Sequence, residues 1–383
     1  MQTPFISNLL LFNFRNYKSM KFEFDNGINI IYGKNGIGKT NILEAISFLS
    51  QGRGLRGDNL ENILLQKTYT NCIGKNDIDY NFPNVLWSVF AKIKDNDYFE
   101  NISVYAAVSD EGKINKNIKI NNENKKQTFL NNVFNVFWLT PAMDEFFNGS
   151  SSVRRKFLDK AVDIIDSEHS KRINKYEFLV RERIKLLTDE SGYDEKWVLV
   201  LERKIAEIGI AIAVARNEIV DYFNKVFKEY YFHFPSLDIN INGYFEELVR
   251  NKKALKCEEQ YVKILYENRR EDARTKKTQV GIHRSDIDIF YKDKGMVASL
   301  CSTGEQKLML ISLTLAKVII CNMLKKARPI LLLDEICSHL DSTKISELFK
   351  EIEKLKVQSF LTGTSKGLFN VEGNFLDLEV LCN

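Results

Sequence analysis

The chain has 383 residues, 44% of them hydrophobic, and a formal net charge of +4 at pH 7, values that fit a globular protein of one large domain or two joined lobes. The small charge permits nucleic-acid binding without requiring it, and for basic clusters such as Arg250–Lys256 and Arg269–Lys277 a solvated surface is the commoner role. The six cysteines are scattered without a C-x-x-C pair, which argues against a zinc site and for a reduced, cytoplasmic setting.

The N-terminal part of the chain predicts two strands, a glycine turn and a helix. Its first residues, "MQTPFISNLLLF", lack the basic leader and the small-residue cleavage site of a secretory signal. The strand-like stretches Leu9–Tyr17 and Met20–Tyr32 come before the turn. Farther along, Val85–Val108 alternates well enough to predict an antiparallel hairpin, whereas residues 113–132 predict a loop or short strands with long turns.

The middle of the chain predicts long helices. Apolar residues recur at steps of three and four from Leu201 to Tyr230, and the stretch around Phe157–Leu187 is also helical. A polar segment with the breaker Gly192 separates the two. Helices of about 30 residues would each be about 45 Å long and could pair as an antiparallel arm. Two ordinary packed helices are the alternative.

The C-terminal part returns to alternating strands and helices. The order is a strand at "DIDIFYKDKG", a helix over Ser302–Leu324, a strand at "PILLLDE", a helix over Ser342–Leu355 and a strand at "SFLTGT". Lys317 interrupts the apolar run of the first helix, and a lysine at the centre of a bilayer costs about 2.5 to 3.5 kcal/mol. We therefore expect a buried helix and no membrane span. The fold class predicted is α/β, with a lobe of residues 1–148 and 277–383 and an inserted helical lobe of residues 149–276.

The glycine turn has the pattern of a phosphate-binding loop. Gly33, Gly38, Lys39 and Thr40 match G-x-x-x-x-G-K-S/T between an apolar strand and a helix. Glycines let the backbone N–H groups surround phosphate oxygens, and the helix presents its positive end. Lys39 would reach the β- and γ-phosphates of ATP, and the Thr40 hydroxyl would ligate Mg²⁺. The nucleotide-binding residues predicted here are Gly33, Lys34, Asn35, Gly36, Ile37, Gly38, Lys39, Thr40 and Asn41.

The strand "PILLLDE" supplies an acidic partner for that metal. Asp334 follows four apolar residues, at the end of a strand where open α/β sheets place their ligands. Asp334 would bind Mg²⁺ through its water shell, and Glu335 would orient or deprotonate the attacking water. Capping of the next turn is the alternative role for Asp334. Lys39, Asp334 and Glu335 are the predicted catalytic residues.

A third motif, "LCSTGEQKLMLISL", opens the apolar helix. Ser302 and Glu305 have the spacing of a capping box, which is one sufficient role for them. The helix end, Ser302 and the Gly304 amide would also form a second phosphate cradle. The near side of the triphosphate is already wrapped by the first loop, so a second cradle becomes useful if it closes over the γ-phosphate of another subunit.

With "STGEQ", "LLLDE" and "SHLD" following the phosphate loop in that order, the chain resembles ABC-type ATPases of the SMC/Rad50 kind. More narrowly, it resembles the RecF family through "NFRNY", "GRGLR", "LTPAMDEFFNGSSSVRRKFLD", "GIHRSDIDI" and "QSFLTGTS". The resemblance runs nearly end to end. It implies an ABC-type ATPase head with a P-loop mixed sheet and an inserted helical lobe.

The resemblance also implies a function. Members form ATP-dependent dimers, hydrolyse ATP slowly under DNA stimulation, bind duplex DNA near gap junctions, and cooperate with RecR and RecO in loading a recombinase. By the same resemblance Arg15 and Asn16 would lie near the nucleotide. Arg154 and Arg155 open the helical lobe, and ion pairing is as ordinary a role for them as DNA contact.

This sequence departs from the family pattern at several positions. Thr303 and Glu305 stand where the signature usually has glutamine, and Glu335 stands where the second aspartate is usual. "GIHRSD" lacks a proline and one acid of the usual Gly-Pro-His-Arg-Asp-Asp, which affects the role expected of His283 and Arg284. No glutamine near Pro141 is assigned to a Q-loop.

Three other functions fit parts of the pattern less well. An ABC transporter ATPase subunit carries a switch histidine after the acidic strand, but the last histidine here is His339, which precedes Asp341. A Rad50-like or chromosome-organising protein has hundreds of residues of heptads, many more than separate Lys39 from Ser302. A binding module with a purely structural nucleotide would not need Asp334 and Glu335.

Overall fold

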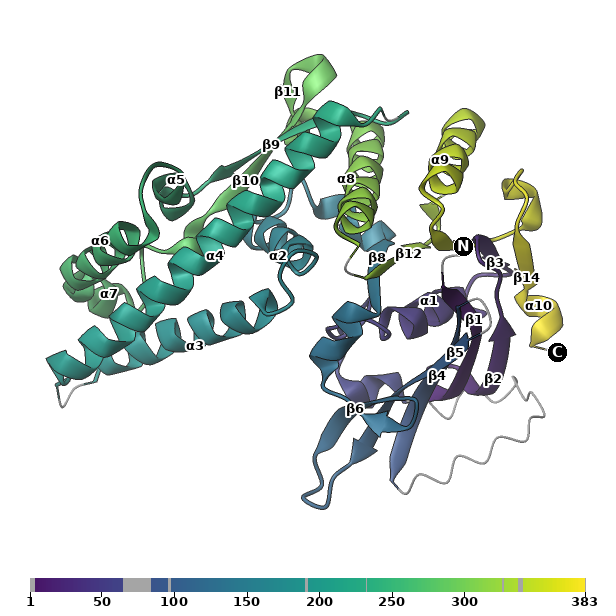
Figure 1. Cartoon of the computed structure of the whole chain (residues 1–383), viewed down its shortest axis with the longest axis horizontal. Helices are drawn as coiled ribbons and strands as arrows, with labels where there is room; N and C mark the ends of the chain where they lie inside the picture. Colours follow the sequence, from purple (N-terminus) through teal and green to yellow (C-terminus); the bar gives the residue numbers. More distant parts are fainter. Residues whose placement is uncertain are drawn as a thin grey trace. The chain divides into compact units, whose positions relative to one another are not determined.

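The computed structural model describes residues 4–64, 84–95, 98–189, 192–231, 233–325, 327–336 and 340–382. Cys72, Cys337 and His339 lie outside the described residues. The chain divides into two compact units, unit 1 with Met1–Met143 and Cys321–Asn383, and unit 2 with Asp144–Ile320 (Figure 1).

This division differs from the predicted lobes over residues 277–320, which group with the helical residues. The physical reason is strand pairing. Strand β10 (Asp286–Tyr291) pairs antiparallel with β9 (Leu237–Asn242), so it belongs to the sheet of the helical unit. Sequence order alone does not reveal that partner.

Unit 1 contains a parallel sheet whose strands end at a common edge. Its order is β14-β3-β13-β12-β8. Three of these strands, β3, β12 and β13, are almost wholly buried, which explains their continuous apolar sequences. The five strands are β3 (Ile28–Tyr32), β8 (Phe134–Leu139), β12 (Arg328–Leu333), β13 (Gln358–Gly363) and β14 (Asn374–Asp377).

The second sheet of unit 1 is antiparallel, in the order β2-β1-β4-β5-β6-β7. It confirms the predicted hairpin over residues 85–108 and extends it with β6, formed from the segment expected to be a loop or short strands. The six strands are β1 (Phe5–Phe14), β2 (Tyr17–Glu23), β4 (Val85–Asp95), β5 (Tyr98–Val108), β6 (Ile114–Ile120) and β7 (Glu123–Asn124).

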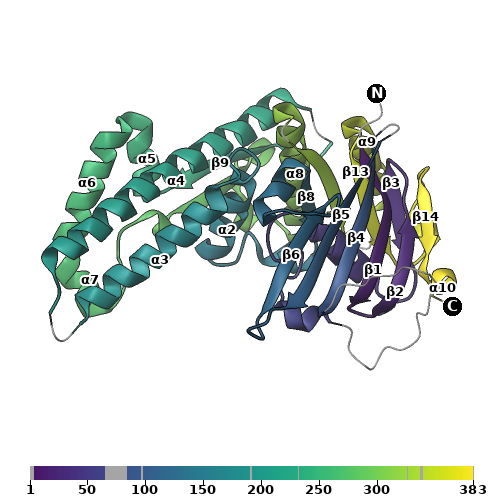
Figure 2. The same cartoon turned by 60° about the horizontal axis from the view of Figure 1, so that its bottom comes forward.

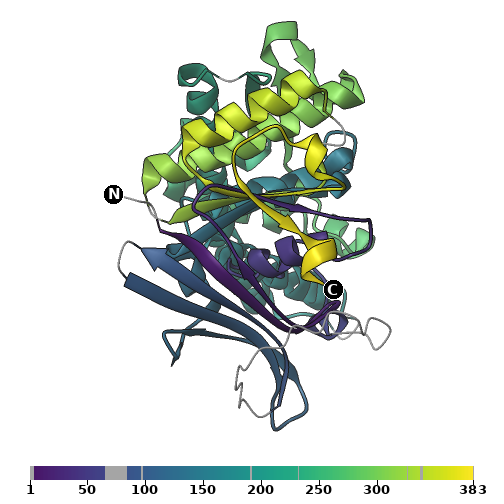
Figure 3. The same ribbon diagram turned by 90° about the vertical axis from the view of Figure 1, so that its right-hand side faces the viewer.

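One hydrophobic core joins the two sheets of unit 1. It includes Leu9 of β1, Val89 of β4, Ile46 of helix α1 (Lys39–Ser47) and Leu332 of β12. Figure 3 shows α1 between the two sheets, with helix α9 (Ser342–Leu355) on the other side of the parallel sheet. Helix α1, which directly follows the predicted phosphate loop, is therefore held in place on both sides.

Unit 2 is built around the 35-residue helix α4 (Glu195–Glu229), which Asp194 caps by accepting hydrogen bonds from the Lys196 and Trp197 amides. The helices α3 and α4 lie side by side as predicted (Figure 2). The expected length of the first helix was wrong, because the chain turns after α2 and forms two shorter helices. The other helices around α4 are α2 (Ser151–Val162), α3 (His169–Leu187), α5 (Tyr244–Asn251), α6 (Ala254–Glu267) and α7 (Arg269–Thr275).

Helix α4 packs against α6 as well as α3, so the pair is not a free arm. Tyr176 and Leu179 of α3, Ile205 of α4, and Tyr261 and Leu265 of α6 share one core. The apolar face of α4 is consequently wider than the single stripe that the sequence indicates.

Helix α8 (Thr303–Leu324) is the apolar helix in which Lys317 lies. Among the described residues it is the one helix long and apolar enough to cross a membrane, and 72% of its apolar window is buried in the protein. Lys317 is buried and its Nζ lies 4.6 Å from the centre of the Phe157 ring. Burial, together with the nearby charge of Lys160, lowers the pKa of Lys317 to about 7. These contacts are those of a helix packed in a protein core.

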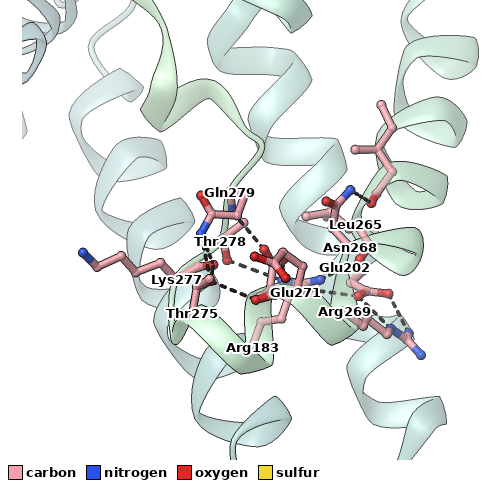
Figure 4. Close-up of polar contacts among 12 residues, drawn as sticks. Arg183, Glu202, Leu265, Asn268, Arg269, Glu271, Thr275, Lys277, Thr278 and Gln279 are labelled. Atoms are coloured by element: carbon pink, nitrogen blue, oxygen red, sulfur yellow. Dashed lines mark hydrogen bonds and ion pairs between the residues drawn. The ribbon is translucent and has the colours of Figure 1, made fainter.

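A buried network of charged side chains joins the helices of unit 2 (Figure 4). The Arg183 Nε of α3 donates to Glu202 Oε1 of α4 at 2.9 Å, and its Nη1 donates to Asp272 Oδ2 of α7 at 2.6 Å. The Arg269 Nη2 donates to Glu202 Oε2 at 2.6 Å. Arg183, Glu202 and Asp272 are fully buried. Each of these charges is therefore stabilised by its ion-pair and hydrogen-bond partners, because water does not reach it.

We expect Glu202→Gln to lower the free energy of unfolding by about 3 kcal/mol, because it leaves Arg183 and Arg269 buried beside a neutral amide. Urea denaturation followed by far-UV circular dichroism measures this change. Glu271→Gln is the matched control, since Glu271 forms an exposed pair with Arg274 and its removal should leave the midpoint unchanged. Equal midpoints for both variants would contradict a structural role for the network.

Candidate nucleotide-binding site

The predicted phosphate loop lies at the carboxyl end of β3 and leads directly into α1. Gly38 adopts φ 115°, and a Cβ atom there would lie 2.5 Å from Asn16 Nδ2 and 2.6 Å from Tyr17 Oη. The Asn16 Nδ2 donates to the Ile37 carbonyl at 2.9 Å. A glycine is needed at position 38 because both the backbone angle and the neighbouring side chains exclude any other residue.

Lys39 points into this loop. Its side chain is buried, and its Nζ donates to the Gly33 carbonyl at 2.7 Å, the Lys34 carbonyl at 3.0 Å and Asn35 Oδ1 at 3.4 Å. Burial lowers the pKa of Lys39, and the nearby Glu335 opposes that shift. The ammonium is thus held at the centre of the loop by acceptors that a bound phosphate would supplement.

Asp334 lies beside the first turn of α1. Thr40 Oγ1 donates to Asp334 at 3.0 Å, and Thr362 Oγ1 donates to the same carboxylate at 2.8 Å. Thr40 and Asp334, 294 positions apart in the chain, therefore present their oxygen atoms together, as predicted. Oxygen donors of this kind suit Mg²⁺, which usually takes one or two protein ligands and completes its shell with phosphate and water. Among the described residues no group of three His, Cys, Asp or Glu side chains forms a separate metal site.

Glu335 follows Asp334 in an unusual backbone conformation. Its φ is 52°, in the left-handed region that residues other than glycine seldom adopt. The Glu335 N–H donates to Thr362 Oγ1 at 2.8 Å, which ties this backbone to β13. Such strain is found where the surrounding structure over-determines a functional residue.

A cavity of about 390 Å³ opens above the loop, within the range of small-molecule sites. Its lining contains predicted residues from the loop, from the first turn of α1 and from the end of β12. The lining residues are Arg15, Asn16, Gly36, Gly38, Lys39, Thr40, Asn41, Arg56, Asn62, Leu64 and Glu335. Gly33, Lys34, Asn35 and Ile37 lie in the same loop, and Asp334 lies next to Thr40.

Sequence reasoning missed Glu44 and Arg56, which organise the wall of this cavity together with the predicted Arg15. The buried carboxylate of Glu44 accepts from Arg15 Nε at 2.8 Å and from Arg56 Nη1 at 2.9 Å. Arg56 Nη1 also donates to Asn41 Oδ1 at 2.9 Å. Glu44 lies one helical turn after Thr40 in α1. This spacing could have indicated that both side chains lie on the same face of the helix. Nothing local indicated that Arg15 and Arg56 would meet there.

Sequence reasoning also missed two residues near the loop. Thr362, near the end of β13, contacts both Asp334 and the Glu335 amide. Glu379, in the short helix α10 (Leu378–Leu381), accepts from the Lys34 N–H at 3.2 Å. Both come from strands or helices distant in sequence, so pattern analysis had no means of pairing them with the loop.

Ser302 and Gly304 lie in unit 2 at the start of α8, and both are exposed. The Ser302 N–H donates to Glu305 Oε2 at 2.9 Å, and the Glu305 N–H donates to Ser302 Oγ at 3.4 Å. This is the predicted capping box. Lys294 pairs with Glu305 and, with the Ser302 bonds, lowers the pKa of that carboxyl to about 2. Glu305 is therefore ionised and committed to the cap.

The motif "GIHRSD" anchors β10 to the helices of unit 2. His283 Nε2 donates to the Thr278 carbonyl at 2.9 Å, so its Nδ1 accepts from Tyr176 Oη at 2.9 Å. A Cβ at Gly281 would collide with Tyr176 Oη. Burial, and after it the charge of Arg284, lowers the pKa of His283. The motif thus has a structural role that fits a neutral histidine.

Arg154 and Arg155 contact the same strand. Arg154 Nη2 pairs with Asp286 Oδ2 at 2.7 Å, and Arg155 Nη1 donates to the Ser285 carbonyl at 2.6 Å. Ion pairing and backbone anchoring, the alternative to DNA contact, account for both guanidinium groups.

Comparison with known proteins gives one consistent result. The family model described as "RecF/RecN/SMC N terminal domain" matches residues 5–379. The DNA replication and repair protein RecF of Rhizobium rhizogenes is 36% identical over 372 residues, covering 96% of this chain and 94% of the relative. The RecF of Mesorhizobium japonicum is 37% identical over 368 residues, covering 95% and 93%.

Solved structures agree with these relatives. The recombination mediator protein RecF with ATPrS, described as part of the RecFOR pathway, superposes with a TM-score of 0.82 at 27% identity and covers 98% of both chains. The corresponding RecF-ATP structure gives 0.79 at 27% identity with the same coverage. The likeness thus extends over almost the whole chain.

Proposed function

Because the chain belongs to the RecF family of DNA replication and repair proteins, we propose that it is an ATP-dependent DNA-binding clamp of recombinational repair and replication restart. It binds duplex DNA next to single-strand gaps as an ATP-induced dimer, helps to load a recombinase, and hydrolyses ATP slowly under DNA stimulation. The observation that carries the proposal is the meeting of Thr40, Asp334 and Glu335 at the loop that holds Lys39.

ATP binding follows from the loop. Its N–H groups and the Lys39 ammonium supply the positive charge that a triphosphate needs, because three carbonyl or amide oxygens already hold the lysine there. A helix dipole alone contributes about 0.3 to 1 kcal/mol, so several such groups must act together to reach micromolar affinity, about 8 kcal/mol. Asn16 and Asn41 fix the loop and the α1 start through their mutual hydrogen bond at 2.7 Å.

Thr40 and Asp334 are the residues that would hold Mg²⁺, the Asp334 carboxylate through water. When bound, the ion neutralises charge on the phosphate oxygens. Thr362 orients the Asp334 carboxylate from the neighbouring strand. The side chain of Glu335 lines the cavity, and this position supports a role in accepting a proton from the attacking water.

The start of α8 in unit 2 supports the proposed dimerisation. The N-terminus of α8 is exposed at Ser302 and Gly304, and a Cβ at Gly304 would meet no atom within 4 Å. An open, capped helix end can receive an anion, and we assign to it the γ-phosphate bound by the partner chain. Partners RecR and RecO, a cytoplasmic location and the absence of membrane contact belong to the same proposal, supported by the family and by the RecFOR description of the solved relative.

We expect ATP to strengthen binding to gapped duplex DNA more than binding to blunt duplex, and Ser302→Arg to remove that ATP effect while leaving ATP affinity unchanged. The arginine side chain occupies the space at the helix end that the γ-phosphate would need. Fluorescence anisotropy of the two DNAs, with light scattering for the dimer, measures this.

Ser299→Arg is the matched control, three residues earlier and also exposed. A normal ATP-bound dimer of Ser302→Arg would exclude the second cradle. Equal binding of gapped and blunt DNA by the wild-type protein with ATP would refute the gap preference.

A further inference from the structure

The antiparallel sheet of unit 1 has a second face, opposite to α1. Side chains alternate along each strand, so Val89, Ala91 and Ile93 of β4 enter the core and are buried, whereas Phe90 and Lys92 between them point the other way and are part-exposed. Figure 2 turns this outer sheet face toward the viewer, and no helix or strand from the described part of unit 1 covers it.

Aromatic rings stand on the outer sheet face on three adjacent strands. Cross-strand register places Phe12 of β1 opposite Ser88, Phe90 of β4 opposite Ser103, and Tyr105 of β5 opposite Ser88. Phe99 of β5 is 50% exposed. These rings are out of the core although phenylalanine and tyrosine usually bury themselves there. They form an open platform bordered by small polar residues.

Lysines are interleaved with these rings. Lys92 Nζ lies 4.0 Å from the centre of the Phe99 ring, and Lys119 Nζ lies 5.9 Å from the centre of the Tyr105 ring. Lys94 is opposite Phe99 in the register. By strand alternation, Lys21 and Glu23 of β2 are on the same side and pair with each other at 2.6 Å.

The described part of this face therefore carries positive charge, in a chain whose total charge is close to balance. Among the described residues, the neighbouring acids do not offset it. Asp95 pairs with Arg328 at 3.0 Å, Glu123 pairs with Lys125 at 2.6 Å, and Glu100 alternates to the side of Ile102. A polyanion complements a surface of this kind.

We propose that the outer sheet face binds single-stranded nucleic acid, with unpaired bases stacking on Tyr105 and Phe99 and with Lys92 and Lys119 contacting phosphates. Rings on a strand repeat at about 6.8 Å and adjacent strands lie about 4.8 Å apart, a spacing on which successive bases can stack. A duplex hides its base faces inside the helix, so an aromatic platform contacts only an unpaired strand.

This inference goes beyond the proposed function. It concerns the side of the sheet opposite to α1, uses none of the nucleotide-binding residues, and requires no ATP.

The test uses the full-length chain and a fluorescent oligothymidine of about 15 nucleotides, without nucleotide. We expect Lys92→Glu/Lys119→Glu to weaken binding at least about tenfold and to reduce the slope of log affinity against log salt by about 0.7 for each phosphate that a lysine no longer neutralises. Lys350→Glu/Lys354→Glu on α9 makes the same charge change elsewhere in unit 1 and should bind as the wild type.

Tyr105 separates stacking from charge. Tyr105→Ala should weaken binding about tenfold, and Tyr105→Phe should restore it, because the ring and not the hydroxyl stacks. Thermal unfolding of each variant checks that the sheet is intact.

Three outcomes would overturn the proposal. The first is that the wild type does not bind the oligothymidine, and the second is that Lys92→Glu/Lys119→Glu and Lys350→Glu/Lys354→Glu bind it with equal affinity. The third is that Lys92→Glu/Lys119→Glu weakens binding of blunt duplex as much as it weakens binding of the oligothymidine. The Lys39→Met variant keeps the outer sheet face intact. Its binding of the oligothymidine therefore tests this proposal independently of the ATP-dependent clamp.

Discussion

Lys39→Met is expected to weaken ATP binding at least about hundredfold. The wild-type ammonium lies 2.7 Å from the Gly33 carbonyl and 3.0 Å from the Lys34 carbonyl, so it is already placed where phosphate oxygens enter the loop. Methionine removes that charge and leaves the buried acceptors unpaired. Hydrogen bonds to a charged group contribute about 1.5 to 3 kcal/mol each, and about 2.7 kcal/mol corresponds to hundredfold.

Isothermal titration calorimetry with ATP and Mg²⁺ measures this weakening. Lys34→Met is the matched control, because the neighbouring Lys34 side chain is 82% exposed and pairs with Glu379 at 3.1 Å. Its affinity should stay within a few-fold of the wild type. Unchanged ATP affinity in Lys39→Met would refute the phosphate loop as the nucleotide site.

Glu335→Gln is expected to slow ATP hydrolysis by about a hundredfold or more while ATP still binds, since a general base contributes about 10² to 10⁴ to a rate. The amide keeps the size of the side chain but cannot take a proton from water. The backbone contact to Thr362 comes from the main chain, so it survives the substitution. The variant should accumulate as a nucleotide-bound dimer on DNA.

Single-turnover hydrolysis of radiolabelled ATP gives the rate of the chemical step. Glu379→Gln is the control, because this carboxylate also lies beside the loop but does not line the cavity. A rate for Glu335→Gln close to that of the Glu379→Gln control would exclude Glu335 as the base.

Much of the site was predictable because its chemistry is local in sequence. The loop from Gly33 to Thr40 combines a buried strand, glycines and a helix start, and each of these has its own signature. Asp334 was predictable for a related reason, since an acid that directly follows an apolar strand must lie at the carboxyl edge of a parallel sheet. The structure brings Thr40 and Asp334 into hydrogen-bonding contact.

The residues that were missed act through partners far away in the chain. Thr362 reaches Asp334 because β12 and β13 are neighbours in the parallel sheet. The local sequence of neither strand specifies which strand will lie beside it. Glu44 binds both Arg15 and Arg56 because β1 and the segment after α1 meet at the same place. The expected long helix before α4 was wrong because helical periodicity continues across the turn between α2 and α3.

The sequence by itself determined the alternation of strands and helices, the phosphate loop, the acidic strand end and the capped helix at Ser302. All of these depend on spacing within a few residues, where backbone geometry limits the possible structures. Only the tertiary structure decided that β10 belongs with β9, that Thr362 orients Asp334, and that aromatic rings and lysines share one open face. Those features depend on which strands become neighbours, and that choice is made by burial of the whole core rather than by any local pattern.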